Sequence, residues 1–474
     1  MKNLIKIIFS LVFLNLIFNV NADAQSVTWQ TWYDYGNYDN EGTDVIQTLD
    51  GGYIFLGVNT ASDANGCFLT KTDQFGSIEW QRLVNETVKG FGGIICYSIQ
   101  QTIDSGYVLS GGGRDSAVII KTNARGETDW IRKYLNFGSD AGFIDHKITL
   151  DGGIIACGTV YPPLAGYVVK TDSLGNIEWD SIYSTTWPQV IQSRDSNFYF
   201  GRAYGLLKTN KYGQTLWLKS YPHGGPSVIE GSDGFIYTGG SAGIDAFYLN
   251  KFDTSGTHIF GKQYYEGANC LSMCLSKEGN ILLAGYTDSI QQGIVAVVKT
   301  DLDGNLIFSK QVFSAFGSLL AFDPYSVKAS NDYGFIFTGY TNYPRFTIYR
   351  ENVFALKTDS NCNAPKFVSI TENQSDVPSS FELYQNYPNP FNNSTRIRFK
   401  LSNSGIVKLD LYDNNGRLIS NIINSYHTSG SYNLLLETND FKMASGIYYL
   451  QMSIRNTFYS NQKYSDIKKI IYIK

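Results

Sequence analysis

One phrase of ten residues recurs along most of the chain, and this repetition restricts the possible folds more than any other feature. The phrase first reads KTDQFGSIEW, at residues 71–80. Six further copies begin at Lys121, Lys170, Lys208, Lys251, Lys299 and Lys357. Successive copies begin 38 to 58 residues apart, and the last one, KTDSNCNAPK, has lost both the glycine and the aromatic residue. A period of about 40–50 residues indicates an array of one supersecondary unit.

Each copy follows a second recurring segment, which first reads QTLDGGYIFLG. Asp50-Gly51 predicts a hairpin turn, because glycine accepts the positive φ that a tight turn needs. The apolar run Tyr53–Leu56 predicts a buried strand, and a third strand ends near Lys71. Asp73 and Gly76 predict the next turn, with the carboxylate bonding the backbone and the glycine in the left-handed conformation. Four strands per period predict a β-propeller blade, and we interpret Lys71, Asp73 and Gly76 as structural residues.

The two ends of the repeat array are incomplete in complementary ways. The copy at Lys357 has no fourth strand, whereas SVTWQ at residues 26–30 resembles SIEWQ at residues 77–81 without three strands before it. A strand around Trp29 would therefore complete the last blade and remove the free sheet edges. We predict an all-β fold whose main part is a seven-bladed β-propeller over residues 26–365, closed by this N-terminal strand.

The connections between the strands predict where a ligand binds. The first and third connections of each unit are short and uniform, and they share one face, here called the turn face. The second and fourth connections vary, and variation confined to one face of an array is typical of a binding face. We call it the loop face. Its longest loop offers a candidate ligand-binding set: Tyr343, Arg345, Phe346, Tyr349 and Arg350.

Other loops of this face also carry aromatic residues, and such residues anchor many interfaces. They are Tyr161, Trp187, Tyr221 and Phe316. The alternative is that these aromatic side chains only cover the edges of the blades.

Composition and the N-terminus point to an exported protein. The chain has 474 residues, 15% aromatic and 17% charged, and its net charge of −4 excludes an overall basic nucleic-acid binder. Lys2 and Lys6 precede an apolar run, Ile7–Phe18, which Ala22-Asp23-Ala24 follows. This pattern predicts a signal peptide at residues 1–24, because the run is too short to span a bilayer. A retained membrane anchor is the alternative.

The cysteines show no regular spacing and no C-x-x-C pair, so buried free thiols are the interpretation we favour, although export would permit disulfides. They are Cys67, Cys96, Cys157, Cys270, Cys274 and Cys362. The chain has four histidines, none of them close to a cysteine in sequence, so we predict no zinc site.

Three patterns imitate active-site motifs, and we predict that none is catalytic. Gly239–Gly243 fits G-x-S-x-G, but Ser241 lies in a loop position of the repeat and no helix follows. Asp301–Asn305 resembles part of a calcium loop without the distal glutamate. The histidines His146, His223 and His258 fall in different repeats. A pair of carboxylates meeting at the centre of the ring stays an open alternative. We predict no cofactor and no metal.

After a polar linker at residues 366–380, a second domain spans residues 381–474. It contains several short alternating segments, including a hairpin around Asn414-Asn415-Gly416. Five to seven antiparallel strands in this length predict a small Ig-like antiparallel β-sandwich.

Both parts resemble known bacterial families. The repeats are similar to those of secreted seven-bladed propellers with a GYT and KTD-x-x-G pattern. The tail resembles the type A C-terminal sorting domain of the type IX secretion system, with Leu411-Tyr412-Asp413, Ser445–Tyr449 and Lys469–Lys474 in the order of that family. Its other matching residues, which the resemblance makes the sorting signal, are Tyr387, Pro388, Asn389, Pro390, Phe391, Gly416 and Gly446. Asn392-Asn393 stands where the family often has Asn-Pro.

The resemblance implies passage through the periplasm, recognition by an outer-membrane translocon and its sorting peptidase, and a final place on the cell surface or in the medium. For the propeller we predict a non-catalytic module that binds a glycan or a protein. The alternative is a hydrolase or lyase that degrades polysaccharides at the centre of the ring. Acidic or basic side chains converging there would favour the enzyme, and an apolar or glycine-lined centre would favour binding alone.

Overall fold

The computed structural model describes two parts that follow one another along the chain. The described residues are 28–36, 39–59, 66–84, 93–113, 116–134, 140–161, 164–184, 188–221, 223–241, 246–287, 295–312, 322–341, 351–363, 381–402, 405–427, 430–437, 444–455 and 463–474. The predicted signal peptide and the predicted linker lie outside them. Every regular element in these ranges is a β-strand, and none is a helix long and apolar enough to cross a membrane.

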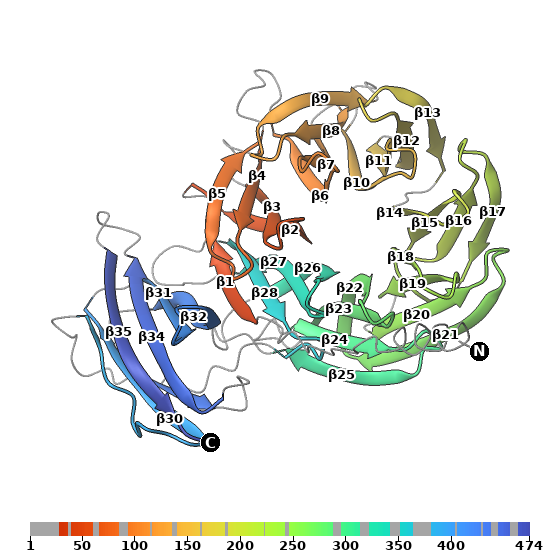
Figure 1. The fold of residues 1–474 in the computed structure, drawn as a ribbon. Helices are drawn as coiled ribbons and strands as arrows, with labels where there is room; N and C mark the ends of the chain where they lie inside the picture. The colour runs from red at the N-terminus through yellow and green to blue at the C-terminus, as the bar shows by residue number, and fades with distance from the viewer. Residues whose placement is uncertain are drawn as a thin grey trace, which may run out of the picture.

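The first part is a ring of antiparallel sheets with four positions from the centre outward (Figure 1). The innermost strands are β2 (Asn40–Gln47), β6 (Ile95–Gln101), β10 (Asp140–Ile148), β14 (Gln189–Gln192), β18 (Ser227–Glu230), β22 (Ala268–Leu275) and β26 (Phe322–Ala329). The second strands are β3 (Tyr53–Asn59), β7 (Tyr107–Gly113), β11 (Ile154–Tyr161), β15 (Phe198–Arg202), β19 (Ile236–Gly240), β23 (Ile281–Thr287) and β27 (Phe335–Thr341).

The third and fourth positions complete the sheets. The third strands are β4 (Gly66–Thr72), β8 (Ser116–Thr122), β12 (Ala165–Thr171), β16 (Gly205–Thr209), β20 (Ala246–Phe252), β24 (Val295–Thr300) and β28 (Asn352–Thr358). The outer strands are β5 (Ile78–Leu83), β9 (Thr128–Tyr134), β13 (Ile177–Tyr183), β17 (Thr215–Ser220), β21 (His258–Glu266), β25 (Leu306–Val312) and β1 (Trp29–Tyr33). The second and third strands are almost entirely buried, because neighbouring sheets cover both of their faces.

Two consecutive repeats merge into one eight-stranded sheet, because β10 pairs with β7 through Ala141↔Gly113 and Gly142↔Gly112. The glycines permit this approach: a Cβ on Gly112 would lie 2.2 Å from the carbonyl oxygen of Ala141. The other sheets of the ring have four strands each.

The predicted closure of the ring is confirmed. β1 pairs with β28 from Trp29↔Lys357 to Tyr33↔Val353, so the start of the chain supplies the outer strand of the last sheet. The Trp29 side chain is 2% exposed, and its Nε1 donates to the carbonyl oxygen of Gln74 at 3.0 Å in the next sheet.

The structure explains why an aspartate and a glycine recur at the turn of the repeated phrase. The Asp73 Oδ1 accepts hydrogen bonds from the backbone N–H groups of Phe75 and Ser77, at 2.8 and 2.9 Å. Gly76 has φ +78°, and a Cβ there would also lie 2.8 Å from the Trp29 ring. The structural interpretation of Asp73 and Gly76 is therefore confirmed.

The lysine of the phrase is structural too. In every repeat it is buried, and its ammonium pairs with the carboxylate of the first turn at an N–O distance of 2.6–3.1 Å. These turn pairs are Lys71–Asp50, Lys121–Asp104, Lys170–Asp151, Lys208–Asp195, Lys251–Asp233, Lys299–Glu278 and Lys357–Asp332. Each pair ties the third strand to the turn that joins the first and second strands.

The cysteine interpretation was wrong for one pair. Cys67 on β4 and Cys96 on β6 form a disulfide with a Cα–Cα distance of 5.7 Å, which links two consecutive sheets. Sequence spacing gave no sign of it, because the two residues become neighbours only when the sheets pack. Cys157, Cys270, Cys274 and Cys362 are free and buried, as predicted.

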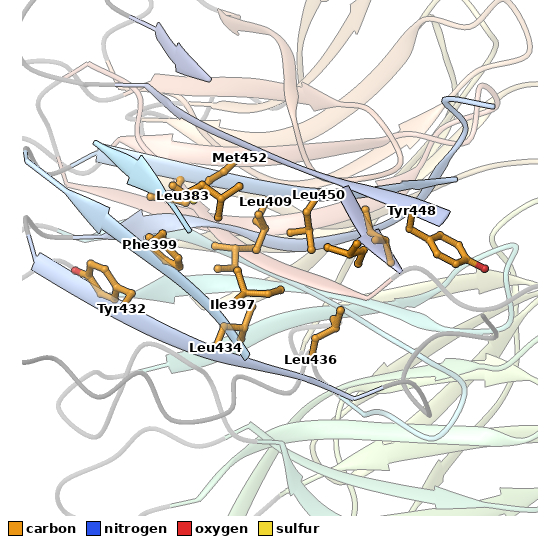
Figure 2. Close-up of a cluster of buried hydrophobic side chains, with 14 of the residues drawn as sticks. Leu383, Ile397, Phe399, Leu409, Tyr432, Leu434, Leu436, Tyr448, Leu450 and Met452 are labelled. Atoms are coloured by element: carbon orange, nitrogen blue, oxygen red, sulfur yellow. The ribbon is translucent and has the colours of Figure 1, made fainter. Parts of the chain in front are cut away.

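The second part consists of two sheets. β29 (Glu382–Leu383), β30 (Ser394–Leu401) and β33 (Gly430–Glu437) form one, and β32 (Leu418–His427), β31 (Gly405–Asp413), β34 (Gly446–Arg455) and β35 (Lys463–Tyr472) form the other. Side chains from both sheets meet in one apolar cluster that includes Ile397, Phe399, Leu409 and Leu450 (Figure 2). The predicted hairpin is present, with Gly416 at φ +78° and the Asp413 carboxylate bonding the turn.

Candidate functional site

A polar residue occupies the same position of every innermost strand, four positions before the first turn. These belt residues are Asp44, Ser98, Asp145, Gln189, Ser227, Ser272 and Ser326. Sequence reasoning missed them, although a polar residue at a fixed offset inside each innermost strand was a readable signal.

Most belt residues bond the neighbouring sheet. The Asp44 Oδ2 accepts the N–H of Ile99, and the Asp145 Oδ2 accepts the N–H of Val190, both at 3.1 Å. The Ser326 hydroxyl donates to Asp44 at 2.6 Å. Gln189 and Ser272 accept in the same way from the next strand around the ring. The belt therefore fastens one sheet to the next at the centre of the ring.

The two belt carboxylates are not available as general acids or bases. Asp44 is 5% exposed and Asp145 is 9% exposed, and both carboxylate oxygens of each accept hydrogen bonds. Burial raises the pKa of Asp145, but the adjacent Lys147 ammonium outweighs it, so the pKa is lowered and the group stays ionised.

The central lysines differ in how fully they are bonded. The Lys147 ammonium donates to both oxygens of Asp145, at 2.6 and 2.7 Å, and to the carbonyl oxygen of His146. The Lys328 ammonium contacts one oxygen of Asp44 at 3.1 Å, and its side chain is 41% exposed. Burial lowers the pKa of Lys328, yet the negative charges of Asp44 and Asp145 raise it overall. The two belt carboxylates and these two lysines thus converge at the centre as ion pairs.

A bulge lies directly before the belt in most innermost strands. The register with the second strand shifts there, so that one residue has no partner opposite it. These bulge residues are Thr43, Tyr97, Ile144, Leu271 and Tyr325. Tyr97 is 41% exposed and Tyr325 is 36% exposed. The loop-face half of the ring centre therefore carries two partly exposed tyrosines, and sequence reasoning did not anticipate them.

The predicted ligand-binding loop, with Tyr343, Arg345, Phe346, Tyr349 and Arg350, lies outside the described residues, as do Trp187 and Phe316. Tyr161 is exposed. Tyr221 is buried, and its hydroxyl donates to the carbonyl oxygens of Arg202 and Gly205. Tyr221 therefore has a structural role, packing in the core and bonding the connection between β15 and β16.

The imitated active-site motifs have structural roles. The Ser241 hydroxyl donates to the carbonyl oxygen of Ala246 at 2.6 Å and accepts the N–H of Cys270 at 2.8 Å. The Asp301 Oδ1 accepts two N–H groups of its own turn. Burial lowers the pKa of His146 to about 4, with Nδ1 2.8 Å from the Ser110 hydroxyl. In the part of the chain that the structure describes, no group of metal-ligating side chains is present.

The segment Tyr387–Phe391 lies along the edge of the last strand. The Asn389 Oδ1 accepts the N–H of Ile471 at 2.9 Å, and its Nδ2 donates to the carbonyl oxygen of Lys469 at 3.2 Å. The backbone of Phe391 bonds both Ile471 and Ile473, and its ring is 2% exposed against Tyr472. The Tyr387–Pro388 and Asn389–Pro390 peptide bonds are cis.

The predicted sorting residues differ in burial. The Tyr387 side chain is 77% exposed, while Phe391 is part of the core. Gly416 lies in the β31–β32 turn and Gly446 begins β34. Asn389 and Phe391 therefore hold the terminal strand in place.

Comparison with known families identifies this second part. Residues 385–471 match the secretion system C-terminal sorting domain family. The match supports export by the type IX secretion system, to the outer surface of the cell or into the medium. No curated protein matches the chain in sequence.

Solved structures resemble the ring. A catalytically inactive virginiamycin B lyase from Staphylococcus aureus, crystallised with quinupristin, is 11% identical with a TM-score of 0.50, and the match covers 69% of this chain and 99% of that one. A protein of unknown function from Bacteroides caccae is 12% identical with a TM-score of 0.39, covering 55% and 93%. The likeness to the lyase shows the fold alone, which is a propeller-like arrangement of sheets.

Proposed function

We propose that this chain is a type IX secretion cargo whose ring is a seven-bladed β-propeller that binds a glycan or a protein without catalysis. The seven innermost strands support the count of blades, with the β7–β10 pairing as a contact between two of them. The ligand binds on the loop face, to which the sequence assigns the candidate loop Tyr343–Arg350, and the bulge residues lie on that side of the belt.

The terminal domain acts as the export signal of the protein. A signal peptide at residues 1–24 carries the chain into the periplasm, and an outer-membrane translocon then recognises the Ig-like, type A sorting domain. A sorting peptidase removes the domain, which leaves the propeller attached to the surface or released. The family match and the two-sheet core support this route.

One observation carries the proposal that the propeller is not an enzyme: both belt carboxylates are buried and fully bonded to neighbouring strands. A glycosidase needs one protonated and one free carboxyl group beside its substrate. The belt carboxylates form ion pairs and backbone hydrogen bonds instead.

Purified full-length chain tests the proposal on an array of polysaccharides and on extracts of surface proteins. We expect retention of at least one probe without release of reducing ends or unsaturated sugars. Breakdown of a bound polysaccharide would overturn the non-catalytic assignment. Replacing Tyr343 and Tyr349 with alanine tests the loop, and unchanged binding of every retained probe would exclude it.

A further inference from the structure

We propose that the loop-face half of the ring centre is a binding site for a neutral sugar residue of a glycan, held between Tyr97 and Tyr325. The inference rests on the proposed binding function and gives it a ligand class and a location. It places the ligand on the innermost strands and assigns no contact to the candidate loop Tyr343–Arg350.

The two tyrosines belong to the strands on either side of β2. β2 contacts both β6 and β26, and the Thr43 hydroxyl donates to the carbonyl oxygen of Cys96 at 3.0 Å, which fixes β2 against β6. Each tyrosine is a bulge residue, so it lies outside the ladder on the strand that borders the centre. The Tyr325 ring also leans on the Tyr340 ring, with centroids 5.9 Å apart. Two partly exposed tyrosines therefore lie on the strands that flank β2, and the Tyr325 ring is anchored by Tyr340.

Polar groups on the same three strands, β2, β6 and β26, have spare hydrogen-bonding capacity. Among the described residues Glu41 has no hydrogen-bond or ion-pair partner, and neither does the Tyr97 hydroxyl. Burial and the negative charge of Glu41 raise the pKa of Tyr97, so its hydroxyl stays a donor. The Lys328 ammonium has three N–H groups and contacts one carboxylate oxygen. The site thus combines acceptors and donors with two aromatic faces.

The local charges favour a neutral ligand. Asp44 pairs with Lys328 and Asp145 pairs with Lys147, so these four charges cancel. Among the described residues, Glu41 is a charge beside Tyr97 that has no ion-pair partner. An acidic sugar would be repelled by Glu41. A neutral sugar presents hydroxyl groups to Glu41, Tyr97 and Lys328 and an apolar ring face to the tyrosines.

The test compares the full chain with Tyr97→Ala and Tyr325→Ala variants on immobilised neutral polysaccharides (laminarin, mannan, dextran) and on acidic ones (alginate, polygalacturonate). We expect the unaltered chain to bind a neutral probe, and each alanine variant to bind it about tenfold more weakly, which is the loss of one stacking contact. Tyr97→Phe and Tyr325→Phe should keep most of the affinity. Tyr212→Ala, at an exposed tyrosine in the turn between β16 and β17 on the turn face, is the matched control and should bind normally.

The outcomes separate this inference from the proposed function. Undiminished binding by both alanine variants, with unchanged melting temperatures, would place the ligand elsewhere and leave the proposed function intact. Binding only to acidic probes or only to proteins would overturn the neutral-sugar site alone. If the unaltered chain binds none of these polysaccharides, the neutral-sugar site is also overturned. Breakdown of a bound polysaccharide would instead contradict the proposed non-catalytic function.

Discussion

The ring and the terminal domain are both built of antiparallel strands, but they are held together in different ways. In the ring, each repeat contributes the same turn pair, the same capped turn and the same belt position, so the stabilising contacts recur with the period of the sequence. In the terminal domain one apolar cluster joins two sheets, and one segment, Tyr387–Phe391, fastens the last strand. Repetition distributes stability over many sites, whereas the terminal domain concentrates it in a few.

The difference also separates the two tasks. The match to a sorting domain is confined to residues 385–471, and the bulge and belt residues are confined to the ring. The comparison therefore predicts that export and ring stability respond to different substitutions.

Removal of the sorting domain should give the largest effect. A chain that ends at residue 380 is expected to remain inside the cell, with an export loss of well over tenfold by cell fractionation, because the matched domain is absent. Its ring should still melt cooperatively. Export of this truncated chain at the normal level would show that export does not depend on the terminal domain, and the division of tasks between the two parts would be wrong.

Two aromatic substitutions should destabilise different parts. Trp29→Ala removes a buried ring from the closing strand and should lower the unfolding free energy of the ring by about 3–5 kcal/mol. Phe391→Ala should lower that of the terminal domain by a similar amount. Calorimetry with limited proteolysis assigns each transition. If both variants shift the same thermal transition, the ring and the terminal domain are not stabilised independently, and the comparison between them is wrong.

Loss of the disulfide should weaken only the ring. The Cys67–Cys96 bridge closes a segment with a sequence separation of 29, so its removal by serine at both positions should cost about 3 kcal/mol. Denaturant unfolding measures this loss. A reductant should destabilise the unaltered chain and leave the double variant unchanged, and equal sensitivity of the two proteins would refute the assignment.

The turn pairs should give the smallest single effect, and one that depends on pH. Burial raises the pKa of Asp104, but the Thr102 hydroxyl and the Lys121 ammonium outweigh it and lower the pKa to about 2. Because the folded pKa lies below the unfolded value of about 3.9, the stabilisation is present above pH 4 and is lost as the pH falls towards 2.

Asp104→Asn should therefore remove under about 1 kcal/mol at pH 7, since this carboxylate is well exposed, and almost nothing near pH 2. Unfolding free energies of the ring at several pH values test this. Glu41→Gln, which removes a carboxylate without a partner among the described residues, is the control and should cost less stability at pH 7. A loss that does not vary with pH would exclude the ion pair as its cause.

Much of the ring could be predicted from the sequence because its determinants are local. Turns such as Asp73–Gly76 depend on φ preferences and short-range hydrogen bonds, which the residue types themselves specify. The closing strand at Trp29 was predictable because the last repeat lacks a fourth strand and the residues around Trp29 resemble one. The seven recurring lysines were assigned a structural role, but their partners in the first turn became visible only in the folded sheets.

The candidate site could be predicted less well. Sequence reasoning chose the variable loops, and the residues that it missed, Tyr97 and Tyr325, lie on innermost strands whose bulges depend on pairing with the second strand. The disulfide was missed for the same kind of reason, since Cys67 and Cys96 belong to different sheets.

The sequence by itself determined the repeat, its turns, the closing strand and the export signal, because each depends on residues close together or on a family pattern. Only the tertiary structure decided which polar groups are satisfied and which are free at the centre of the ring. Those contacts join strands from separate repeats, and the distance between such strands is set by how whole sheets pack.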